Sequence, residues 1–542
     1  MAIELPPSQS DFSSLHKLTT PTRRGLIAMA ASSTVIPMPV WSATTIPTTP
    51  IVPPYVREGA NVRDARFGSG LAADGRAILP LGAQSKRVWL DTQAASSTGK
   101  GTSAASPFRN EADAYAAMRS GDQLMIASGS VLTQRFVQME FMGGLSAVYP
   151  TVVQSYDRAA PDDETRYGLL TNEVTYSGSV PFMGNIRYSP ISFVALRGIR
   201  FDHSAARAEY FFGQGINWLL IEQCAFLAAQ LSLNSAYGTT VNVVRQTAFQ
   251  GQWAASGHAQ GLYTSYNYDT VIEDCIFFHC GWKMGVTRSA AADQGGPTIF
   301  NHAVYAHVKS GGILRRCVFV EPSSHGAQLR GNWHSHDNVF ISCPLPLLHG
   351  GGTTYAIDAP NGVMALCYRN IVTIAQWISP TLPRGFGIDI VNTRPGSVVE
   401  QNLIVGPGAV RAGEAWTAVA QAGVGYAPNP TVITFQRNTY DWSNYTHNQT
   451  ATSRVLLTEK DNIVPADKAS FADPSRDGIS AARSFGFQTV GDFGTAMVAD
   501  PTKPWALRIA DHIRPGFAPR GRRLAGGVVK GAVLPDGSWN SG

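Results

Sequence analysis

The hexapeptides IEQCAF (residues 221–226), VRQTAF (244–249), IEDCIF (272–277) and LRRCVF (314–319) repeat one pattern, and this pattern decides the fold. Each begins with an apolar residue, carries a small residue at its fourth position and ends in phenylalanine. Short alternating segments of this kind predict β-strands. The fourth positions are Cys224, Thr247, Cys275 and Cys317. SHDNVF, CYRNIV, VEQNLI and FQRNTY continue the series with Asn338, Asn370, Asn402 and Asn438, and LRGIRF around Gly198 is an earlier variant copy.

The spacing of these copies indicates a solenoid. Successive copies lie between 21 residues (317 to 338) and 42 residues (275 to 317) apart. A constant strand with irregular spacing is expected when loop insertions lie on one side of stacked coils. A β-sandwich also has many short strands, but it does not readily place a small or amide residue at one strand position eight times. We therefore predict an all-β fold, a right-handed parallel β-helix.

The composition agrees with this architecture. The chain has 542 residues, of which 44% are apolar and 15% charged, so it can bury a large core but is too long for one ordinary globule. Its 53 glycines and 33 prolines fit frequent turns between short strands. The net charge of +5 comes without the basic runs typical of nucleic-acid binders. We expect no nucleic-acid partner, whereas an anionic substrate is compatible with the charge.

Residues 1–43 resemble a twin-arginine export signal. Arg23 and Arg24 precede the mostly apolar stretch LIAMAASSTVIPMPV, and the small residues Ser42 and Ala43 follow. The resemblance implies bacterial export of a folded protein to the periplasm or the medium. No later apolar run reaches eighteen residues, so we expect no membrane insertion of the mature chain.

Six cysteines could form disulfides in an oxidising compartment. Three of them, however, precede short apolar segments in the repeat, which suits small buried side chains. No CxxC or Cys/His spacing typical of a metal site is present. We predict buried thiols and no metal bound by cysteine.

The segment VWLDTQAASSTGKGTSAASPFRNEADAYAAMRSGDQLMIASGSV, residues 88–132, resembles the opening of pectate-lyase-like β-helix proteins. The matching elements are Trp89 to Asp91, Gly101 to Ser103, Pro107, Phe108, the helical EADAYAAM, Gly121 and Asp122. In that superfamily the helix covers the open end of the first coil. The resemblance covers roughly residues 85–445 and is fairly specific for the fold. It is weak for the reaction, because β-helices include lyases, hydrolases, esterases, epimerases and phage tailspikes. Residues 44–84 are interpreted as a Pro- and Thr-rich arm and lead-in, and residues 446–542 as an irregular C-terminal cap.

Polar residues gather at one position of three successive predicted coils. His302 and His325 are 23 residues apart, about one coil, so we expect them on neighbouring coils roughly 5 Å apart. Tyr263 precedes Cys275 by twelve residues, as Tyr305 precedes Cys317. The predicted cluster comprises His258, Tyr263, His302, Tyr305, His325, Gln328 and Arg330. A stacked polar ladder that only stabilises the turns is the structural alternative for each residue alone. Several titratable groups on one face favour function for the set.

Further candidate substrate contacts flank the cluster. FFHCGWKMGVTR contains His279, Trp282 and Lys283, and the insertion at residues 281–300 is expected to lie over the same face. A tryptophan beside basic residues suits an acidic sugar, although ordinary packing explains Trp282 equally well. Lys309 and Trp333 complete the candidate set.

These residue types permit β-elimination of a uronic-acid polymer. That reaction requires a base, an acid for the leaving oxygen and a cation that neutralises the carboxylate. We assign His302 as the preferred base, Tyr305 as the acid and Arg330 as the neutralising group. His325 and His258 are supporting or alternative bases, and an exchange of roles between His302 and His325 stays open.

Two other functions remain as alternatives. A glycoside hydrolase needs two carboxylates, but residues 300–333 contain a single acid, Glu321. A non-catalytic glycan-binding or structural β-helix is the other alternative. No cluster of acids suggests calcium, so a metal-independent polysaccharide lyase without a cofactor is predicted, with calcium dependence left open. No pattern specifies an oligomeric state.

Overall fold

The structure is a computed structural model. It describes residues 58–59, 62–136, 142–178, 192–204, 208–212, 217–234, 241–286, 291–350, 362–374, 377–379, 382–383, 386–405, 417–421, 431–436, 438–440 and 455–460. The predicted export signal at residues 1–43 and most of the predicted C-terminal cap lie outside these residues. None of the described helices has the length and apolar character needed to cross a membrane.

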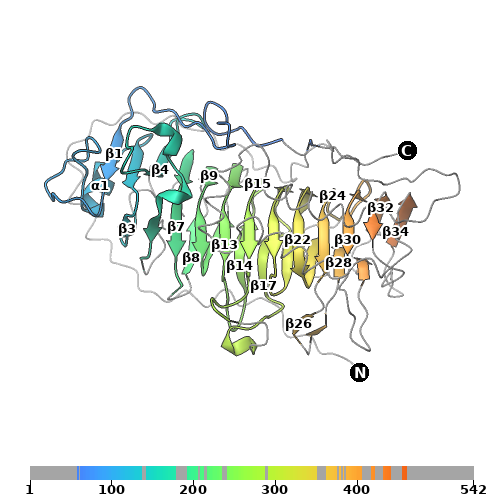
Figure 1. Ribbon diagram of the computed structural model, residues 1–542. Helices are drawn as coiled ribbons and strands as arrows, with labels where there is room; N and C mark the ends of the chain where they lie inside the picture. The colour runs from blue at the N-terminus through green and yellow to red at the C-terminus, as the bar shows by residue number, and fades with distance from the viewer. Residues whose placement is uncertain are drawn as a thin grey trace, which may run out of the picture. The chain divides into compact units, whose positions relative to one another are not determined.

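Three parallel sheets dominate the described residues, and from residue 194 to residue 421 each coil contributes one strand to each sheet in turn (Figure 1). Sheet 1 consists of β1 (Arg87–Leu90), β2 (Gln123–Ala127), β4 (Thr151–Tyr156), β6 (Val194–Arg197), β9 (Trp218–Glu222), β12 (Val241–Arg245), β15 (Asp269–Glu273), β18 (Gly311–Arg315), β21 (Asn332–His336), β24 (Ala365–Tyr368), β29 (Val398–Glu400), β32 (Thr431–Gln436) and β34 (Val455–Lys460). Sheet 2 consists of β3 (Val131–Leu132), β5 (Val174–Tyr176), β7 (Ile199–Asp202), β10 (Ala225–Leu227), β13 (Ala248–Gln250), β16 (Ile276–Phe278), β19 (Val318–Val320), β22 (Val339–Cys343), β25 (Ile371–Ile374), β30 (Leu403–Val405) and β33 (Thr439–Tyr440). Sheet 3 consists of β8 (Ala208–Phe212), β11 (Ala229–Asn234), β14 (Ala259–Ser265), β17 (Asn301–Ala306), β20 (His325–Leu329), β23 (Leu345–His349), β28 (Phe386–Ile390) and β31 (Thr417–Gln421).

This topology confirms the predicted right-handed parallel β-helix. Short elements complete the description: the antiparallel pair β26 (Trp377–Ser379) and β27 (Leu382–Pro383), the helix α1 (Glu111–Ala117), and the 3-10 turns η3 (Glu164–Arg166), η4 (Leu170–Asn172) and η5 (Ala292–Gln294). Sheet 1 continues to β34, which pairs with β32, so parallel pairing extends past residue 445, where the sequence led us to expect it to end.

The repeated hexapeptide forms a corner rather than one continuous strand, which corrects the sequence interpretation. In IEQCAF, β9 ends at Glu222, and Gln223 then adopts a left-handed conformation with φ 55°. β10 begins two residues later at Ala225. Asp274 and Arg316 repeat this left-handed turn with φ 55° and 51°. The fourth residue therefore follows a sharp bend, where only a small or amide side chain fits in the core.

Two kinds of stacking fill the interior. The ring centroid of Phe249 lies 5.2 Å from that of Phe226 and 4.7 Å from that of Phe277, and the rings are nearly parallel in both pairs. Asn370 donates its side-chain N–H to Oδ1 of Asn402 at 3.0 Å, one step of an amide ladder. The six cysteines are buried thiols that form no disulfide with one another, as predicted: Cys224, Cys275, Cys280, Cys317, Cys343 and Cys367. Residues of the same type on successive coils therefore stack directly on one another.

The helix predicted to cover the first coil is α1. Asn110 caps its first turn by accepting a hydrogen bond from the N–H of Ala112. Tyr115 is buried and stacks on Phe136 with ring centroids 4.2 Å apart. Figure 1 shows α1 beside β1, at the N-terminal end of the stack. The helix therefore adds its apolar face to the core where the first coil has no preceding neighbour.

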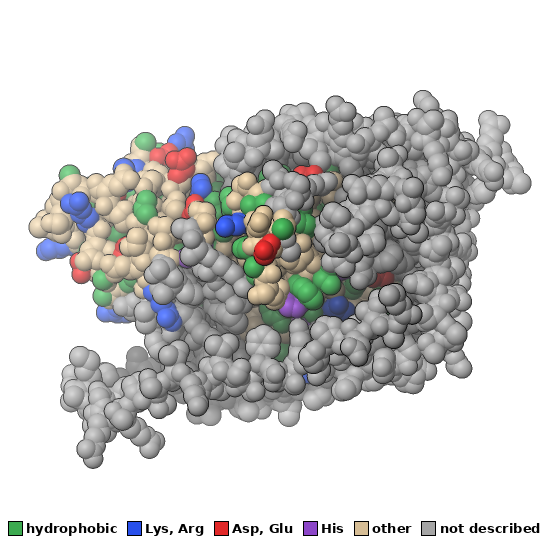
Figure 2. Space-filling view, turned by 90° about the horizontal axis from the view of Figure 1, so that it is seen from below, with side chains coloured by type: hydrophobic (Ala, Val, Ile, Leu, Met, Phe, Trp, Pro, Cys, Tyr) green, Lys and Arg blue, Asp and Glu red, His purple; other side chains and the backbone are tan. Residues whose placement is uncertain are grey.

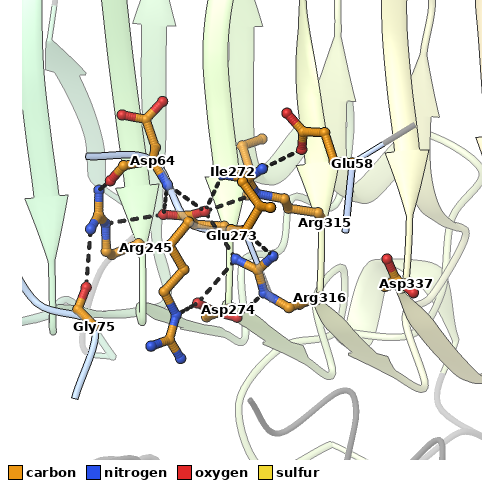
Figure 3. A network of polar contacts seen from close by, with 12 residues as sticks. Glu58, Asp64, Gly75, Arg245, Ile272, Glu273, Asp274, Arg315, Arg316 and Asp337 are labelled. Atoms are coloured by element: carbon orange, nitrogen blue, oxygen red, sulfur yellow. Dashed lines mark hydrogen bonds and ion pairs between the residues drawn. The ribbon is translucent and has the colours of Figure 1, made fainter. Parts of the chain in front are cut away.

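The N-terminal arm, residues 58–59 and 62–80, lies on the outer face of sheet 1. Phe67 is fully buried there against an apolar stripe that includes Val243 and Val271. Beside it, the carboxylate of Glu273 contacts Arg245 at 3.3 Å and Arg315 at 2.7 Å (Figure 3). The arm joins this network because its main chain supplies hydrogen-bonding groups. Arg245 donates to the carbonyls of Asp64 and Gly75, and Glu273 accepts from the N–H of Asp64.

Candidate functional site

Five of the seven residues of the predicted cluster lie on β14, β17 and β20, three consecutive strands of sheet 3, and His258 and Arg330 lie directly before β14 and directly after β20. The register pairs Tyr263 with Tyr305 and Tyr305 with Gln328, so these three side chains follow one another across the coils. Gln260 pairs with His302 on the same strands. The structure thus brings Tyr263, Tyr305 and Gln328 into one row, and the functional roles assigned to the cluster stay predictions.

His302 and His325 are in direct contact. Their Nδ1 atoms lie 3.2 Å apart and their ring centroids 4.9 Å apart, close to the spacing expected from the sequence. One Nδ1 must carry the proton and donate it to the other, because two lone pairs cannot form this hydrogen bond. Ser324 Oγ lies 3.3 Å from Nδ1 of His325. The pair therefore has two tautomeric arrangements that differ in which ring presents an unprotonated Nε2.

Tyr305 stands at the centre of the cluster. Its ring lies 5.6 Å from that of His302 and 6.5 Å from that of His258. On the preceding coil Tyr263 stacks on it at 5.7 Å. The guanidinium of Arg330 lies over the Tyr305 ring, 5.9 Å from its centroid, within the range of a cation–π interaction. A phenol hydroxyl, two imidazoles and a cation thus converge on one face.

Burial sets the protonation of His302, which is only 2% exposed. Burial is the largest cause that lowers its pKa well below the ordinary value of 6.5, and the nearby His325, His258 and Arg330 act in the same direction. His302 is therefore neutral at physiological pH. His325 and Tyr305, in contrast, are each partly exposed. The buried ring supports the cluster from beneath, and the partly exposed groups face outward.

Gln328 brings a polar atom without a partner to the same row. Its side chain is 4% exposed, and its Oε1 accepts no hydrogen bond within the described part of the chain. A buried amide oxygen without a donor costs about 1–3 kcal/mol.

Two of the flanking candidates contact Glu321, whereas a third is exposed. His279 contacts Glu321 at 2.8 Å, and the indole of Trp282 donates to the carbonyl of Glu321 at 3.0 Å. Trp282 is 6% exposed, so packing is its observed role and the predicted sugar contact is not supported. Lys283 is exposed and lies over the ring of Trp253, 5.7 Å from its centroid. Of these three side chains, Lys283 remains available to an anionic ligand.

Trp333 is a corrected prediction. It is fully buried in the core, and its indole donates to Ser310 Oγ at 3.2 Å. The surrounding GNWHSHDN suggested a polar turn, but β21 alternates, with Trp333 and Ser335 inward and His334 and His336 outward. Trp333 therefore stabilises the coil and does not contact substrate.

Sequence reasoning missed two exposed aromatic residues next to the cluster. Phe300 precedes β17 and contacts His258 edge-on, with ring centroids 5.1 Å apart. Tyr266 follows β14, and the Nζ of Lys309 lies 5.2 Å from its ring centroid. Single aromatics at strand ends produce no periodic signal. Only their place directly beside sheet 3 strands could have marked them.

Metal and carboxylate chemistry find little support near the cluster. No group of three or more His, Cys, Asp or Glu side chains within the described ranges is arranged to hold a metal ion. Glu321, the single acid of residues 300–333, is engaged by His279. Seen from below relative to Figure 1, the molecule shows a histidine among hydrophobic side chains, with a Lys or Arg side chain close by (Figure 2). The reactive groups of the cluster are therefore imidazole, phenol and guanidinium.

Comparisons with known proteins reveal likeness in fold. No family model and no curated protein matches the chain. Among solved structures, a mutant tailspike protein of E. coli bacteriophage HK620 in complex with a pentasaccharide is similar at 15% identity and a TM-score of 0.35, over 64% of this chain and 55% of the tailspike. Pectate lyase Pel9A is similar at 12% identity and a TM-score of 0.31, over 77% of this chain and 88% of its own. A PL6 family polysaccharide lyase from Pseudopedobacter saltans is similar at 9% identity and a TM-score of 0.32, over 72% and 94%.

These values concern architecture alone. The fold and site define a parallel β-helix protein with a histidine–tyrosine–arginine cluster on sheet 3. The chain is similar to the β-helix proteins named above, and what it does must be argued from its own residues.

Proposed function

We propose that the protein is a metal-independent polysaccharide lyase that cleaves a uronic-acid-containing polysaccharide by β-elimination. The observation that carries this proposal is the contact between Nδ1 of neutral, buried His302 and Nδ1 of partly exposed His325, beside the Tyr305 ring and Arg330. It combines a base, an acid and a cation on one face without a pair of carboxylates.

Of the two open assignments for the base, burial favours His325. A side chain that is 2% exposed, such as His302, has almost no surface with which to meet a polymer. With its Nδ1–H donated to His302, His325 presents an unprotonated Nε2. This nitrogen takes the proton from the carbon next to the uronate carboxylate. The imidazolium that forms keeps its hydrogen bond to neutral His302, which acts as a positioning residue.

The remaining steps use Arg330 and Tyr305. Arg330 pairs with the uronate carboxylate and stabilises the negative charge that develops as the C–H bond breaks. The electron pair of this bond forms a carbon–carbon double bond, and the glycosidic C–O bond at the next carbon breaks. Tyr305 donates its hydroxyl proton to the departing oxygen and recovers a proton from His325 through solvent. The products are a new chain end and an unsaturated uronate.

The decisive experiment incubates the protein with a panel of bacterial, algal and plant uronic-acid polymers. We expect ultraviolet absorbance of the unsaturated uronate to rise together with reducing ends. Reducing ends without this absorbance would indicate hydrolysis, and binding without either signal would indicate a glycan-binding protein. Both outcomes contradict the proposal.

Export is part of the same proposal, because a polysaccharide substrate of this kind is met outside the cytoplasm. It rests on Arg23 and Arg24 ahead of an apolar stretch. Replacing both arginines with lysine should retain the protein in the cytoplasm, as measured by cell fractionation. Unchanged export of the double variant would contradict the twin-arginine assignment.

A further inference from the structure

We propose that the glycan lies parallel to the strands of sheet 3, along one coil, and that Phe300 and Tyr266 are aromatic sugar-binding platforms at its two ends. This inference rests on the proposed function, because it takes the His325 and Tyr305 cluster as the place of reaction. It adds the direction of the polymer and two binding residues that the cluster does not include.

The first platform is Phe300, directly before β17. Its side chain is 44% exposed, which is unusual for a phenylalanine. Its position is defined nevertheless: the ring packs edge-on against His258, and its carbonyl accepts a hydrogen bond from the side chain of Gln260 at 3.5 Å. His258 in turn lies 6.3 Å from His302 by ring centroids. Phe300 is thus one ring removed from the reacting groups.

The second platform is Tyr266, directly after β14. It is 39% exposed, and its ring lies 6.2 Å from that of His307 and 5.2 Å from Nζ of Lys309. The N–H of His307 donates to the carbonyl of Thr264 at 2.8 Å, which continues the ladder beyond the end of β17. This end therefore combines an aromatic ring with a lysine.

Four features consequently follow one another along a single strand direction: Phe300, His302, Tyr305 and His307. Seven residue steps of about 3.3 Å span roughly 23 Å, which is long enough for several sugar rings. The apolar faces of pyranose rings pack on aromatic side chains, and a uronate carboxylate attracts Lys309. Lysine at the Tyr266 end places an acidic sugar there.

The perpendicular direction, along the stack, offers no such path. The row that contains Tyr305 runs through Ser232, Tyr263, Gln328 and Leu348 on successive coils. Ser232 is fully buried, Gln328 is 4% exposed and Leu348 is 6% exposed, so only Tyr263 and Tyr305 of this row reach the surface. Exposed aromatic surface next to the cluster occurs at the strand ends instead.

The test measures binding of uronic-acid oligosaccharides of two, four and six residues by isothermal titration calorimetry. Tyr305→Phe serves as the background, so that the ligand is not consumed. We expect Phe300→Ala and Tyr266→Ala each to weaken binding of the hexamer about tenfold, which corresponds to about 1.4 kcal/mol. The double variant should weaken it about a hundredfold, because the two ends act independently. The two-residue oligosaccharide cannot reach both platforms, so its affinity should change less than twofold in at least one of the two single variants.

Tyr149→Ala is the matched control, because Tyr149 is also 39% exposed but precedes β4 of sheet 1. It should bind every oligomer like the background. Equal losses for all three lengths, or an equal loss in Tyr149→Ala, would overturn the inference. Turnover by the protein that retains Tyr305 separates the two proposals. If this protein performs elimination but neither Phe300→Ala nor Tyr266→Ala changes the affinity for the hexamer, the platforms alone are refuted. Absence of both elimination and binding in the wild type refutes both proposals.

Discussion

Glu273 and Arg315 form an ion pair beneath the N-terminal arm, with 2.7 Å between Oε2 and Nη2 and both side chains almost fully buried. The same carboxylate contacts Arg316 at 3.0 Å and Arg245 at 3.3 Å. Three guanidinium groups from neighbouring coils therefore share this carboxylate, and each of them also contacts a second one, that of Glu222, Glu58 or Asp274. The arm covers this network, as Figure 3 shows for Asp64 and Gly75.

The first prediction concerns this carboxylate. Glu273→Gln keeps the shape of the side chain but leaves buried arginines without their shared counter-charge, so it should lower the free energy of unfolding by about 3–5 kcal/mol. Urea unfolding measures this loss, and limited proteolysis should show faster cleavage of the arm. Glu164→Gln is the control, because that carboxylate is 64% exposed and pairs with Arg87 at the surface. It should cost less than about 1 kcal/mol. Equal costs for the two variants would contradict a structural role for the network.

The second prediction separates chemistry from scaffolding. Tyr305→Phe removes one hydroxyl and keeps the ring that stacks on Tyr263 and under Arg330. Turnover of the uronic-acid polymer should fall by about a hundredfold or more, while the urea midpoint stays unchanged. His325→Ala should reduce turnover similarly, and the double variant should fall little further, because groups that act together are not additive.

The control for this experiment is Tyr149→Phe, a tyrosine outside the cluster. It should turn over substrate normally. Normal turnover by Tyr305→Phe, combined with unfolding of His302→Ala, would show instead that the cluster is a stabilising ladder.

The third prediction tests the coil stacking. Phe277 is fully buried between Phe249 and Phe319, at 4.7 Å from each. Phe277→Ala should therefore cost about 3–5 kcal/mol in urea unfolding. Its neighbour Phe278 points to the other side of β16, is partly exposed and stacks on His279. Phe278→Ala should cost clearly less, and the reverse order would contradict the assignment of the inward face.

The stacking was predictable because it repeats. A phenylalanine such as Phe277 recurs at one position in successive copies, and every copy must satisfy the same neighbours. The contact between His302 and His325 was predictable for the same reason, since one coil separates them. The corner within each hexapeptide was not predictable, because a glutamine such as Gln223 gives no sequence signal that its backbone is left-handed.

Other features have no repeat to reveal them. Arg63 of the arm pairs with Asp274, more than two hundred residues later, and neither residue stands out in the sequence. Phe300 and Tyr266 are single residues whose exposure depends on where the strands end. Trp333 was misplaced because polar neighbours suggested a turn, whereas its strand alternates between core and surface.

The last prediction concerns acid stability and rests on three buried histidines. Burial is the main cause that lowers the pKa of His349 to about 3 and of His334 to about 4, and it lowers that of His302 well below 6.5. In the unfolded chain each pKa returns to about 6.5. Below this value the unfolded state binds protons that the folded state does not, so stability is fully present above pH 6.5 and is lost as the pH falls toward the folded pKa values.

Each such histidine can contribute a slope of up to about 1.4 kcal/mol per pH unit. Urea midpoints measured between pH 7.5 and pH 4 should therefore fall steeply in the wild type. His349→Gln removes one of these protons, and glutamine can still contact Ser335 Oγ, which lies 2.7 Å from Nε2 of His349. The variant should be less stable than the wild type at pH 7.5, yet its stability should decline less between pH 6.5 and pH 4. A decline as steep as that of the wild type would show that His349 is protonated in the folded protein, and that its burial does not suppress its charge.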